Sequence, residues 1–313
     1  MSHKLAFIFP GQGAQSVGMI DAFLGDFPQF AARFAQASAA LDFDLLALVR
    51  HGPADELNRT QNTQPALLAA SVALWDVWNA LGGSQPSVMA GHSFGEYSAL
   101  VCAGALDFAE AVKLVADRGR FMQEAVPSGA GGMSAVLGLD RATLDAVCAH
   151  ACEHETVQCA NLNAPGQIVI SGSAGALERA AQGARQAGAK RVMPLAVSVP
   201  AHSALMRPAA VRFQDRIAEV AFVEPRIPII HNVDVTSHTT PAAIRAALIQ
   251  QLDCAVRWQE TIEHFAALGV TQVVECGPGK VLSPLVKRCA SNLQTFSLSG
   301  PAELRAALAE LGD

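Results

Sequence analysis

The sequence has no run of basic residues: 22 lysines and arginines stand against 28 aspartates and glutamates, for a formal net charge of −6. A protein that binds the phosphate backbone of nucleic acid needs a basic patch, so we expect no nucleic-acid partner. The opening segment "MSHKLAFIFPGQG" also lacks a long apolar run, because the apolar stretch ends at Pro10. That stretch is too short for a signal-peptide core or a membrane span, and we expect a soluble cytoplasmic protein with no membrane partner.

Cysteines are few and odd in number, with seven scattered over 313 residues. This usage favours reduced thiols over a disulfide framework. One segment, "ATLDAVCAHACEHE", groups four side chains of metal-ligating type, Cys148, His150, Cys152 and His154. The segment is predicted to be a helix, on which His150 points away from the face that carries both cysteines. One ion cannot collect all four side chains, so we expect an apolar core stripe that includes Leu144, and no metal site.

Hydrophobic residues make up 51% of the chain, enough for a substantial core in one large α/β domain or in a large and a small one. Short apolar runs predict strands, and apolar residues at helical spacing predict helices. The predicted strands are 4–9, 133–139, 167–172, 191–198, 227–233 and 270–277. The longest predicted helices are 64–83 and 107–126.

The pattern of elements changes after the loop 127–132. Strand-like and helical segments then alternate in β-α-β-α-β order over roughly seventy residues, which suits a small layer of helices on a sheet, similar to a ferredoxin-like unit. Larger elements return after Pro200. We therefore expect a large domain made of residues 1–126 and 199–313, with residues 127–198 inserted in it as a small subdomain.

Residues 91–95, "GHSFG", match the G-x-S-x-G pattern between a short apolar run and a segment that can form a helix. In that pattern a sharp strand-to-helix turn exposes a serine hydroxyl, and the glycines relieve the crowding of the backbone. A bare match also arises by chance, so the neighbouring residues have to support it. Ser93 is the candidate nucleophile.

A turn-borne serine needs a base, and His202 in "VSVPAHSAL" is the best-placed histidine. It follows a predicted strand end, where α/β sheets present loops to their ligand. His92 is a poor candidate, because adjacent side chains on a tight turn diverge. No acidic partner stands in an obvious place, so a backbone carbonyl is expected to orient the imidazole of His202.

Acyl transfer also needs donors for the oxyanion. The amide of Phe94 is free at the start of the helix after the turn. A second amide is expected from the loop "FPGQGAQ" (9–15), which follows the first strand. This loop is a near miss to the dinucleotide fingerprint, since Ser16 holds the third glycine position, and "GPGK" (277–280) lacks the remaining residues of a phosphate loop.

Arg118 lies on the apolar stripe of the predicted helix 107–126, opposite the polar stripe that carries Arg120. A buried guanidinium cannot stay unpaired without a large cost. Two readings follow. Arg118 either forms a structural pair with an internal Asp or Glu, or provides a bidentate seat for the carboxylate of a substrate.

Several segments together resemble the malonyl-CoA:acyl carrier protein transacylase family: "FPGQGAQ", "TQPALLAASVALW", "GHSFGEYSALVCAGAL", "RGRFMQEAVP", "NAPGQIVISG", "VPAHSALM" and "GPGKVL". The match runs in order over nearly the whole chain. The resemblance implies an α/β fold, with an α/β-hydrolase-like large domain and an inserted ferredoxin-like small subdomain. It also implies a ping-pong transfer of malonyl from malonyl-CoA to a serine and then to the phosphopantetheine thiol of an acyl carrier protein, without a cofactor, for fatty acid biosynthesis.

The resemblance assigns roles by motif. Ser93 would be the nucleophile, His202 the base and Arg118 the group that binds the malonyl carboxylate. The amides of Gln12 and Phe94 would form the oxyanion hole. Gln251 in "IQQLDCAVRW" counts with the substrate-binding residues and would lie behind the base.

Two positions bear on the choice of acyl group. Leucine is the commonest residue after the nucleophile in this family, and Phe94 stands there. Ala201, before the base, is the second position. Carrier proteins of this kind are acidic, and this chain is net acidic as well. Because the two proteins repel each other overall, docking needs a local basic patch. The candidates are Lys190, Arg191, Lys280, Lys287 and Arg288.

Other functions stay open from the sequence. A serine hydrolase or thioesterase would share Ser93 and His202 but would not need Arg118. A patatin-like lipase would need an Asp-Gly pair, which the sequence does not contain. A non-catalytic subunit of an acyl-carrier assembly, or an acyltransferase that serves a polyketide synthase or malonate decarboxylase carrier protein, are further readings.

Overall fold

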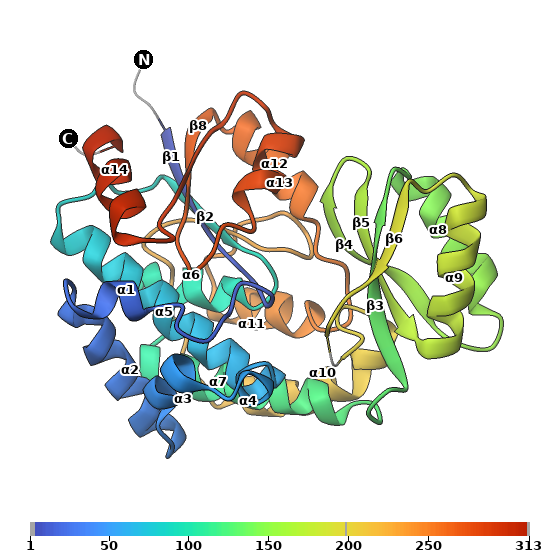
Figure 1. Cartoon of the computed structure of the whole chain (residues 1–313), viewed down its shortest axis with the longest axis horizontal. Helices are drawn as coiled ribbons and strands as arrows, with labels where there is room; N and C mark the ends of the chain where they lie inside the picture. Colours follow the sequence, from blue (N-terminus) through green and yellow to red (C-terminus); the bar gives the residue numbers. More distant parts are fainter. Residues whose placement is uncertain (1–3, 198, 312–313) are drawn as a thin grey trace.

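The computed structural model describes residues 4–197 and 199–311, which form two sheets (Figure 1). The larger sheet is parallel throughout, in the order β7-β2-β1-β8-β9. Its strands are β1 (Lys4–Phe9), β2 (Val88–Gly91), β7 (Ile229–Ile230), β8 (Val270–Glu275) and β9 (Gln294–Ser297). Parallel strands need crossover connections, and helices on both faces of the sheet supply them here.

Strand β1 shows why both faces need a cover. Successive side chains of a strand point to opposite faces, and every residue from 5 to 9 is apolar and buried. Leu5, Phe7 and Phe9 therefore enter one hydrophobic cluster, whereas Ala6 and Ile8 enter a second one on the other face. An apolar run without alternation is typical of such a central strand.

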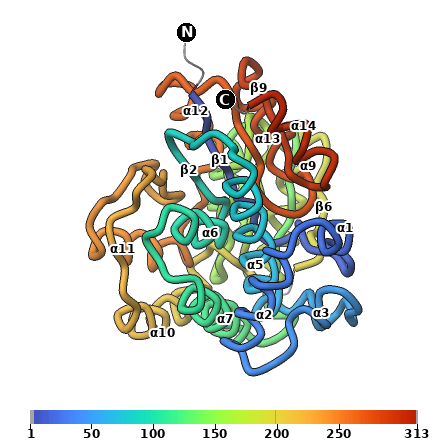
Figure 2. The backbone as a smooth tube through the Cα atoms, turned by 90° about the vertical axis from the view of Figure 1, so that its left-hand side faces the viewer, coloured from blue at the N-terminus to red at the C-terminus, as the bar shows by residue number. Residues whose placement is uncertain are grey.

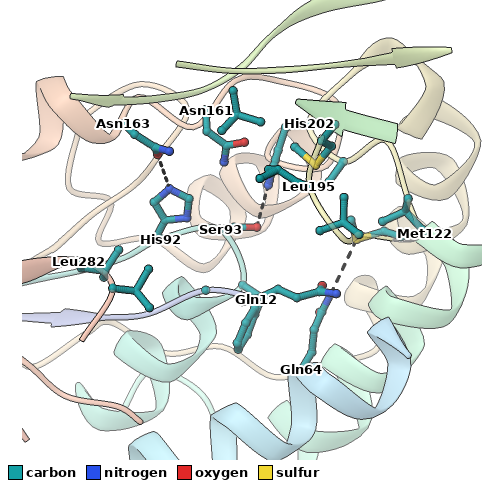
Figure 3. A pocket seen from close by; sticks show the side chains of 18 of the residues that line it. Gln12, Gln64, His92, Ser93, Met122, Asn161, Asn163, Leu195, His202 and Leu282 are labelled. Atoms are coloured by element: carbon teal, nitrogen blue, oxygen red, sulfur yellow. Dashed lines mark hydrogen bonds between the residues drawn. The ribbon is translucent and has the colours of Figure 1, made fainter. Parts of the chain in front are cut away.

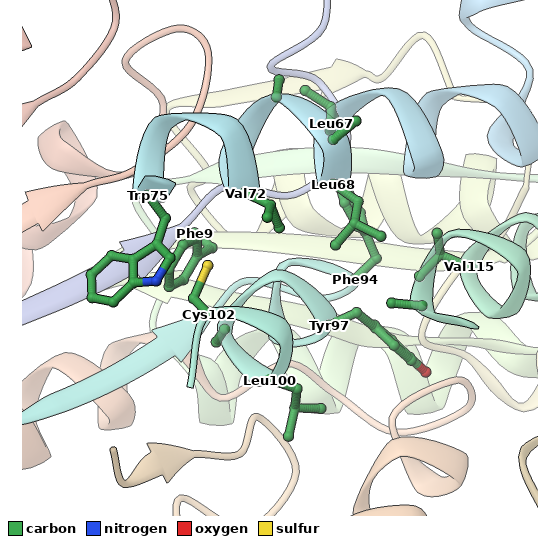
Figure 4. Packing of buried hydrophobic residues seen from close by; sticks show 14 of the residues in the cluster. Phe9, Leu67, Leu68, Val72, Trp75, Phe94, Tyr97, Leu100, Cys102 and Val115 are labelled. Carbon is green, nitrogen blue, oxygen red and sulfur yellow. The ribbon is translucent and has the colours of Figure 1, made fainter. Parts of the chain in front are cut away.

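The first cluster fills the space between the sheet and a layer of long helices. These are α2 (Pro28–Leu41), α5 (Thr60–Ala80), α6 (Gly95–Cys102) and α7 (Phe108–Glu124). Figure 2 shows α2, α5 and α7 side by side, and Figure 4 shows Phe9, Trp75 and Cys102 packed in this cluster. The second cluster packs the opposite face against α12 (Trp258–Ala267) and α13 (Ser283–Cys289).

The remaining helices of this unit are shorter or lie at its edge. They are α1 (Asp21–Leu24), α3 (Leu45–His51), α4 (Ala54–Leu57), the 3₁₀ turn η1 (Ala204–Met206), α10 (Arg207–Ala218), α11 (Pro241–Gln250) and α14 (Pro301–Leu311). No helix in the described part of the chain has both the length and the apolar character that crossing a bilayer requires.

The smaller sheet is antiparallel, in the order β4-β5-β3-β6. It consists of β3 (Gly131–Leu137), β4 (Val157–Ala164), β5 (Gln167–Ser173) and β6 (Arg191–Pro194), with α8 (Arg141–Cys152) and α9 (Ala174–Gln186) on one face. Its β-α-β-β-α-β sequence is that of a ferredoxin-like unit. The predicted α/β fold class is confirmed.

The structure adds β4 and the edge strand β9 to the predicted set, and the alternation of β4 is hidden because polar Asn161 and Asn163 face a cavity rather than solvent. The predicted strand 227–233 is wrong in length. Only Ile229 and Ile230 pair, because the chain turns at His231 to place polar groups behind the nucleophile. The predicted strand 191–198 is shorter as well, and its last residue lies outside the described ones.

All four strands of the smaller sheet fall between residues 127 and 198, and the larger sheet takes its strands from both flanking segments. The domain boundaries themselves stay a prediction, and residues 1–3, 198 and 312–313 of the predicted ranges lie outside the described residues. The apolar stripe predicted for the cysteine-rich helix is confirmed, since Leu144, Cys148 and Ala151 are buried in the cluster beneath α8.

Candidate active site

The serine turn joins β2 to α6 and has the strained geometry that exposes a side chain. Ser93 has a φ of +54°, in the left-handed region. Glycine is required on both sides of it, because a Cβ on Gly91 would lie 1.9 Å from the carbonyl carbon of Gly95, and a Cβ on Gly95 would lie 2.3 Å from the oxygen of Phe9. Asn232 pins the turn: its Oδ1 accepts the N–H of Ser93 at 2.7 Å and its Nδ2 donates to the Gly91 carbonyl at 2.7 Å.

His202 faces the nucleophile across the cavity (Figure 3). Its Nε2 lies 2.7 Å from Ser93 Oγ, and its Nδ1 lies 2.7 Å from the backbone oxygen of Gln251. A carbonyl oxygen only accepts, so Nδ1 carries the proton and Nε2 is free to accept the proton of the serine hydroxyl. Burial, and secondarily the positive charge of Arg118, lowers the pKa of His202 to about 3, which keeps the imidazole neutral.

Arg118 enters the same site from α7 and is only 1% exposed. Its Nη1 donates to Gln64 Oε1 at 3.0 Å, and its Nη2 lies 2.9 Å from Gln251 Oε1 and 3.4 Å from Ser93 Oγ. Its Nε is buried without a partner, and within the described residues no carboxylate comes within ion-pair distance of the guanidinium. The structure thus offers Arg118 amide oxygens where a structural pair would have an Asp or Glu.

Two residues at the cavity have backbone amides without a partner in the described structure. Phe94 is the N-cap of α6, and Gln12 follows the end of β1 and lines the cavity. In residues 4–197 and 199–311, neither of these N–H groups has a protein acceptor. Free amides beside a reactive hydroxyl are what an oxyanion needs.

The cavity around Ser93 has a volume of about 180 Å³ and is lined by side chains from the smaller sheet and from loops and helices of the larger unit. Its polar part comprises Gln12, Gln64, His92, Ser93, Arg118, Asn161, Asn163 and His202. Apolar side chains complete the wall, among them Met122, Met133 and the predicted specificity position Ala201. A small space that combines a positive charge with apolar walls suits a short acyl chain that ends in an anion.

Gln251 occupies a different position from the other predicted site residues. It is fully buried, and the cavity lining does not include it. Its backbone holds His202, its Oε1 accepts from Arg118, and its Nε2 donates to the Ser93 carbonyl at 3.0 Å. Gln251 therefore connects Ser93, His202 and Arg118 from behind and does not border the cavity.

Sequence reasoning missed the polar residues that the smaller sheet contributes. His92 lies 2.8 Å from Asn163 Oδ1 and edge-on to the ring of Trp258, and Asn161 stands beside it in the cavity. The signal was present, because Asn161 and Asn163 are two residues apart, the spacing that places strand residues on one face. Gln64, just before a proline inside α5, gave no comparable signal.

The described residues contain no group of His, Cys, Asp or Glu that could hold a metal ion. The groups brought together at the cavity are instead a serine hydroxyl, a neutral imidazole, two backbone amides and a guanidinium without a carboxylate partner. This set can form an ester on Ser93 and can select an acyl group that carries a negative charge.

Comparison with known proteins agrees with that chemistry. Residues 6–300 match the model of the acyl transferase domain family. The chain is 53% identical to the malonyl CoA-acyl carrier protein transacylase of Salmonella typhimurium over 307 residues, which cover 98% of this chain and 99% of that protein. It is 45% identical to the protein of that name from Bacillus subtilis, with 98% and 97% covered.

Solved structures give the same result. The malonyl CoA-acyl carrier protein transacylase of Coxiella burnetii superposes with a TM-score of 0.98 at 48% identity, covering 100% of this chain and 99% of that one. A malonyl-transacylase in complex with a type II polyketide acyl carrier protein has a TM-score of 0.97 at 49% identity, with 98% and 99% covered. The chain therefore belongs to the acyl transferase domain family and, within it, to the malonyl CoA-acyl carrier protein transacylases.

Proposed function

We propose that this protein transfers the malonyl group of malonyl-CoA to the phosphopantetheine thiol of an acyl carrier protein, through a malonyl ester on Ser93, for fatty acid biosynthesis. The relatives' names give this reaction, and the observation that carries it here is the open guanidinium of Arg118. A buried arginine without a carboxylate partner is costly unless a ligand completes it. A serine hydrolase or thioesterase would have no use for that cation 3.4 Å from its nucleophile.

In the first half-reaction, Ser93 Oγ attacks the thioester carbonyl while its proton passes to His202 Nε2. The negative charge that develops on the carbonyl oxygen is bound by the N–H groups of Gln12 and Phe94. The C–S bond then breaks, the imidazolium returns its proton to the sulfur, and CoA leaves as a thiol. In the second half-reaction the carrier thiol gives its proton to His202 and attacks the Ser93 ester; the C–O bond then breaks, and the imidazolium returns the proton to Ser93 Oγ, which restores the hydroxyl.

The carbonyl of Gln251 takes the place that an acid has in a Ser-His-Asp triad. It holds the Nδ1–H tautomer of His202 but brings no negative charge. This suits a site that must bind a malonyl carboxylate, because an aspartate there would repel the substrate and attract Arg118.

Intact-protein mass spectrometry after mixing with malonyl-CoA tests the proposal. The chain should gain the mass of one malonyl group and keep it until a thiol acceptor is added. Ser93→Ala should gain nothing and stay folded, and His202→Ala should acylate about 10²–10⁴ times more slowly. Malonyl-CoA consumption in water without an acceptor would instead indicate a hydrolase, and acylation of the Ser93→Ala variant would place the nucleophile elsewhere.

The partner in the second half-reaction is an acidic protein, and three of the predicted basic residues lie around one hollow. Lys190 and Arg191 reach it from the start of β6, and Arg288 reaches it from α13. All three are exposed. We place carrier docking at this hollow. A panel of purified carrier proteins, including polyketide carriers, would identify the acceptor, and a cytoplasmic location stays a prediction.

A further inference from the structure

Glu96 is a buried carboxylate directly behind the site. It lies in the first turn of α6, is 1% exposed, and does not line the cavity. Its oxygens accept three N–H groups: His231 Nδ1 at 2.7 Å, the backbone of Asn232 at 3.2 Å, and Nε2 of Gln251. In the part of the chain that the structure describes, no lysine or arginine forms an ion pair with Glu96. Its negative charge is therefore stabilised by these N–H groups and not by a lysine or an arginine.

The histidine beside Glu96, His231, contacts it as a hydrogen-bond donor. Its Nδ1 lies 2.7 Å from Glu96 Oε1, and its Nε2 is buried and has no hydrogen-bond partner among the described residues. A carboxylate only accepts, so Nδ1 carries a proton. His231 thus acts as one more N–H donor to the carboxylate.

The amide of Gln251 lies between Glu96 and Arg118, and its two ends are not interchangeable there. A carboxylate can only accept and a guanidinium can only donate. Gln251 must therefore turn Nε2 toward Glu96 and Oε1 toward Arg118, as observed. Glu96 fixes this orientation, and the amide keeps the two opposite charges close without letting the carboxylate occupy the guanidinium.

A second connection runs from Glu96 to the nucleophile. Glu96 holds the backbone N–H of Asn232, whose side chain holds the N–H of Ser93 and the carbonyl of Gly91. Gln251 adds a bond to the Ser93 carbonyl through the same Nε2 that faces Glu96. Glu96 thus orients Asn232 and Gln251, which together fix the serine turn, and the same Gln251 amide contacts Arg118.

We propose that Glu96 is a positioning residue of the transfer reaction, which sets the preference for malonyl by orienting Gln251 toward Arg118 and Asn232 toward Ser93. This role rests on the proposed malonyl transfer. It does not involve contact between Glu96 and the substrate. Loss of the carboxylate should let the amide of Gln251 turn, and Arg118 would then face an N–H group in place of an oxygen.

The test is the substitution Glu96→Gln, with kcat/KM measured for malonyl-CoA and for acetyl-CoA and free pantetheine as acceptor. A lost hydrogen bond to a charged group corresponds to about tenfold or more, so the malonyl-to-acetyl ratio should fall by about that factor. The matched control is Glu275→Gln, which also neutralises a fully buried carboxylate in the larger unit but touches neither Gln251 nor Asn232. The control should leave the ratio unchanged.

An unchanged ratio in folded Glu96→Gln, with both rates reduced in proportion, would overturn the role and leave Glu96 as a residue of the fold. Should that variant not fold, Glu96→Asp keeps the charge but shortens the reach toward Gln251, and it must lower the ratio in the same direction or the role is wrong. Intact mass of the unmodified chain separates the two proposals. Absence of malonyl-Ser93 there overturns the proposed function, whereas acylation with an unchanged ratio in the variants overturns only the role of Glu96.

Discussion

Two regions of the larger unit each bury a charge, and they treat it in opposite ways. At the end of β8, Glu275 is 0% exposed and its oxygens accept four donors: the N–H groups of Val281, Leu282 and Ser283 and the hydroxyl of Ser283, all at 2.7–2.8 Å. At the cavity, Arg118 is 1% exposed, its hydrogen bonds go to two amide oxygens and a serine hydroxyl, its guanidinium lies over the ring of Tyr97, and its Nε has no hydrogen-bond partner in the described structure.

The difference separates a charge that serves the fold from a charge that serves a ligand. A buried carboxylate whose oxygens accept four donors is stable as it stands, and Glu275 uses these bonds to fix the N-terminus of α13. A buried guanidinium that has N–H donors without acceptors favours the binding of an anion, because an anion supplies both the missing acceptors and the opposite charge.

The largest expected effect is the loss of malonyl transfer when Arg118 is removed. Arg118→Ala should lower kcat/KM for malonyl-CoA by about 10²–10⁴, since two charge-assisted hydrogen bonds of about 1.5–3 kcal/mol each are lost. Acetyl transfer should stay equal or improve, because acetyl leaves Arg118 unsatisfied in the unmodified chain. Steady-state rates with both thioesters give the ratio.

Arg118→Lys sharpens this prediction. A lysine restores the charge but not the planar fork, so malonyl transfer should recover only in part. A proportional loss of malonyl and acetyl transfer in Arg118→Ala would mean that the arginine, like Glu275, serves the fold. The comparison between the two charges would then fail.

Neutralising Glu275 should lower the stability of the fold and leave the malonyl-to-acetyl ratio unchanged. In Glu275→Gln, the side-chain N–H₂ group would face the backbone N–H groups of 281–283 and the hydroxyl of Ser283, all of which are donors here. The free energy of unfolding should therefore fall by about 3 kcal/mol. Denaturant titration measures this loss. A normal midpoint together with an altered malonyl-to-acetyl ratio would contradict the assignment of Glu275 to the fold.

The sequence allowed the buried charge of Arg118 to be predicted, but not the residues that contact it. Arg118 could be placed on the apolar stripe because helix periodicity is local, and Ser93 because its turn requires glycines at fixed offsets. The partners Gln64 and Gln251 lie 54 and 133 residues away from Arg118, and nothing local fixes such a distance. For the same reason the choice between a structural pair and a ligand seat needed the three-dimensional structure.

The fold was predictable to a similar degree. Strand β1, which is buried on both faces, gave an unbroken apolar run at residues 5–9 and was found at the expected residues. Strand β4 was missed and β7 was predicted too long because both serve the site. There, polar residues such as Asn163 and His231 break the pattern that marks a core strand.

Acid should reveal a third kind of buried group, a histidine held neutral. Burial lowers the pKa of His202 to about 3 and also lowers the pKa of His92, whereas an unfolded chain has histidines near 6.5. Below about pH 6.5 the unfolded state therefore binds more protons than the native state, so stability falls as the pH falls. His202 should contribute a loss of about 2 kcal/mol between pH 6.5 and 5, and His92 acts in the same direction.

Unfolding curves at several pH values, compared with those of His202→Asn, measure this contribution. The variant cannot titrate at that position, so its stability should decline less steeply over the same interval. An identical slope in the two proteins would show that burial does not lower the pKa of His202, so that its imidazole would be protonated at mildly acidic pH and unable there to accept the proton of Ser93.

The smallest effect is expected from charges that are not buried at all. Reversal of Lys190, Arg191 and Arg288 to Glu should slow transfer to carrier protein by about tenfold at low ionic strength, and added salt should reduce the difference. Transfer to free pantetheine should not change, because exposed charges act on the approach of a partner and not on the ester at Ser93. Initial rates with the two acceptors test this.

A matched control reverses three exposed basic residues that do not border the hollow, Arg50, Lys113 and Arg305. Both triple variants carry the same net charge, so a purely global repulsion of the acidic partner would slow transfer equally in the two. A local docking site predicts a loss only in the first. Equal loss with carrier protein, or loss with free pantetheine, would show that Lys190, Arg191 and Arg288 are ordinary solvated charges, and that docking depends on another surface around the cavity.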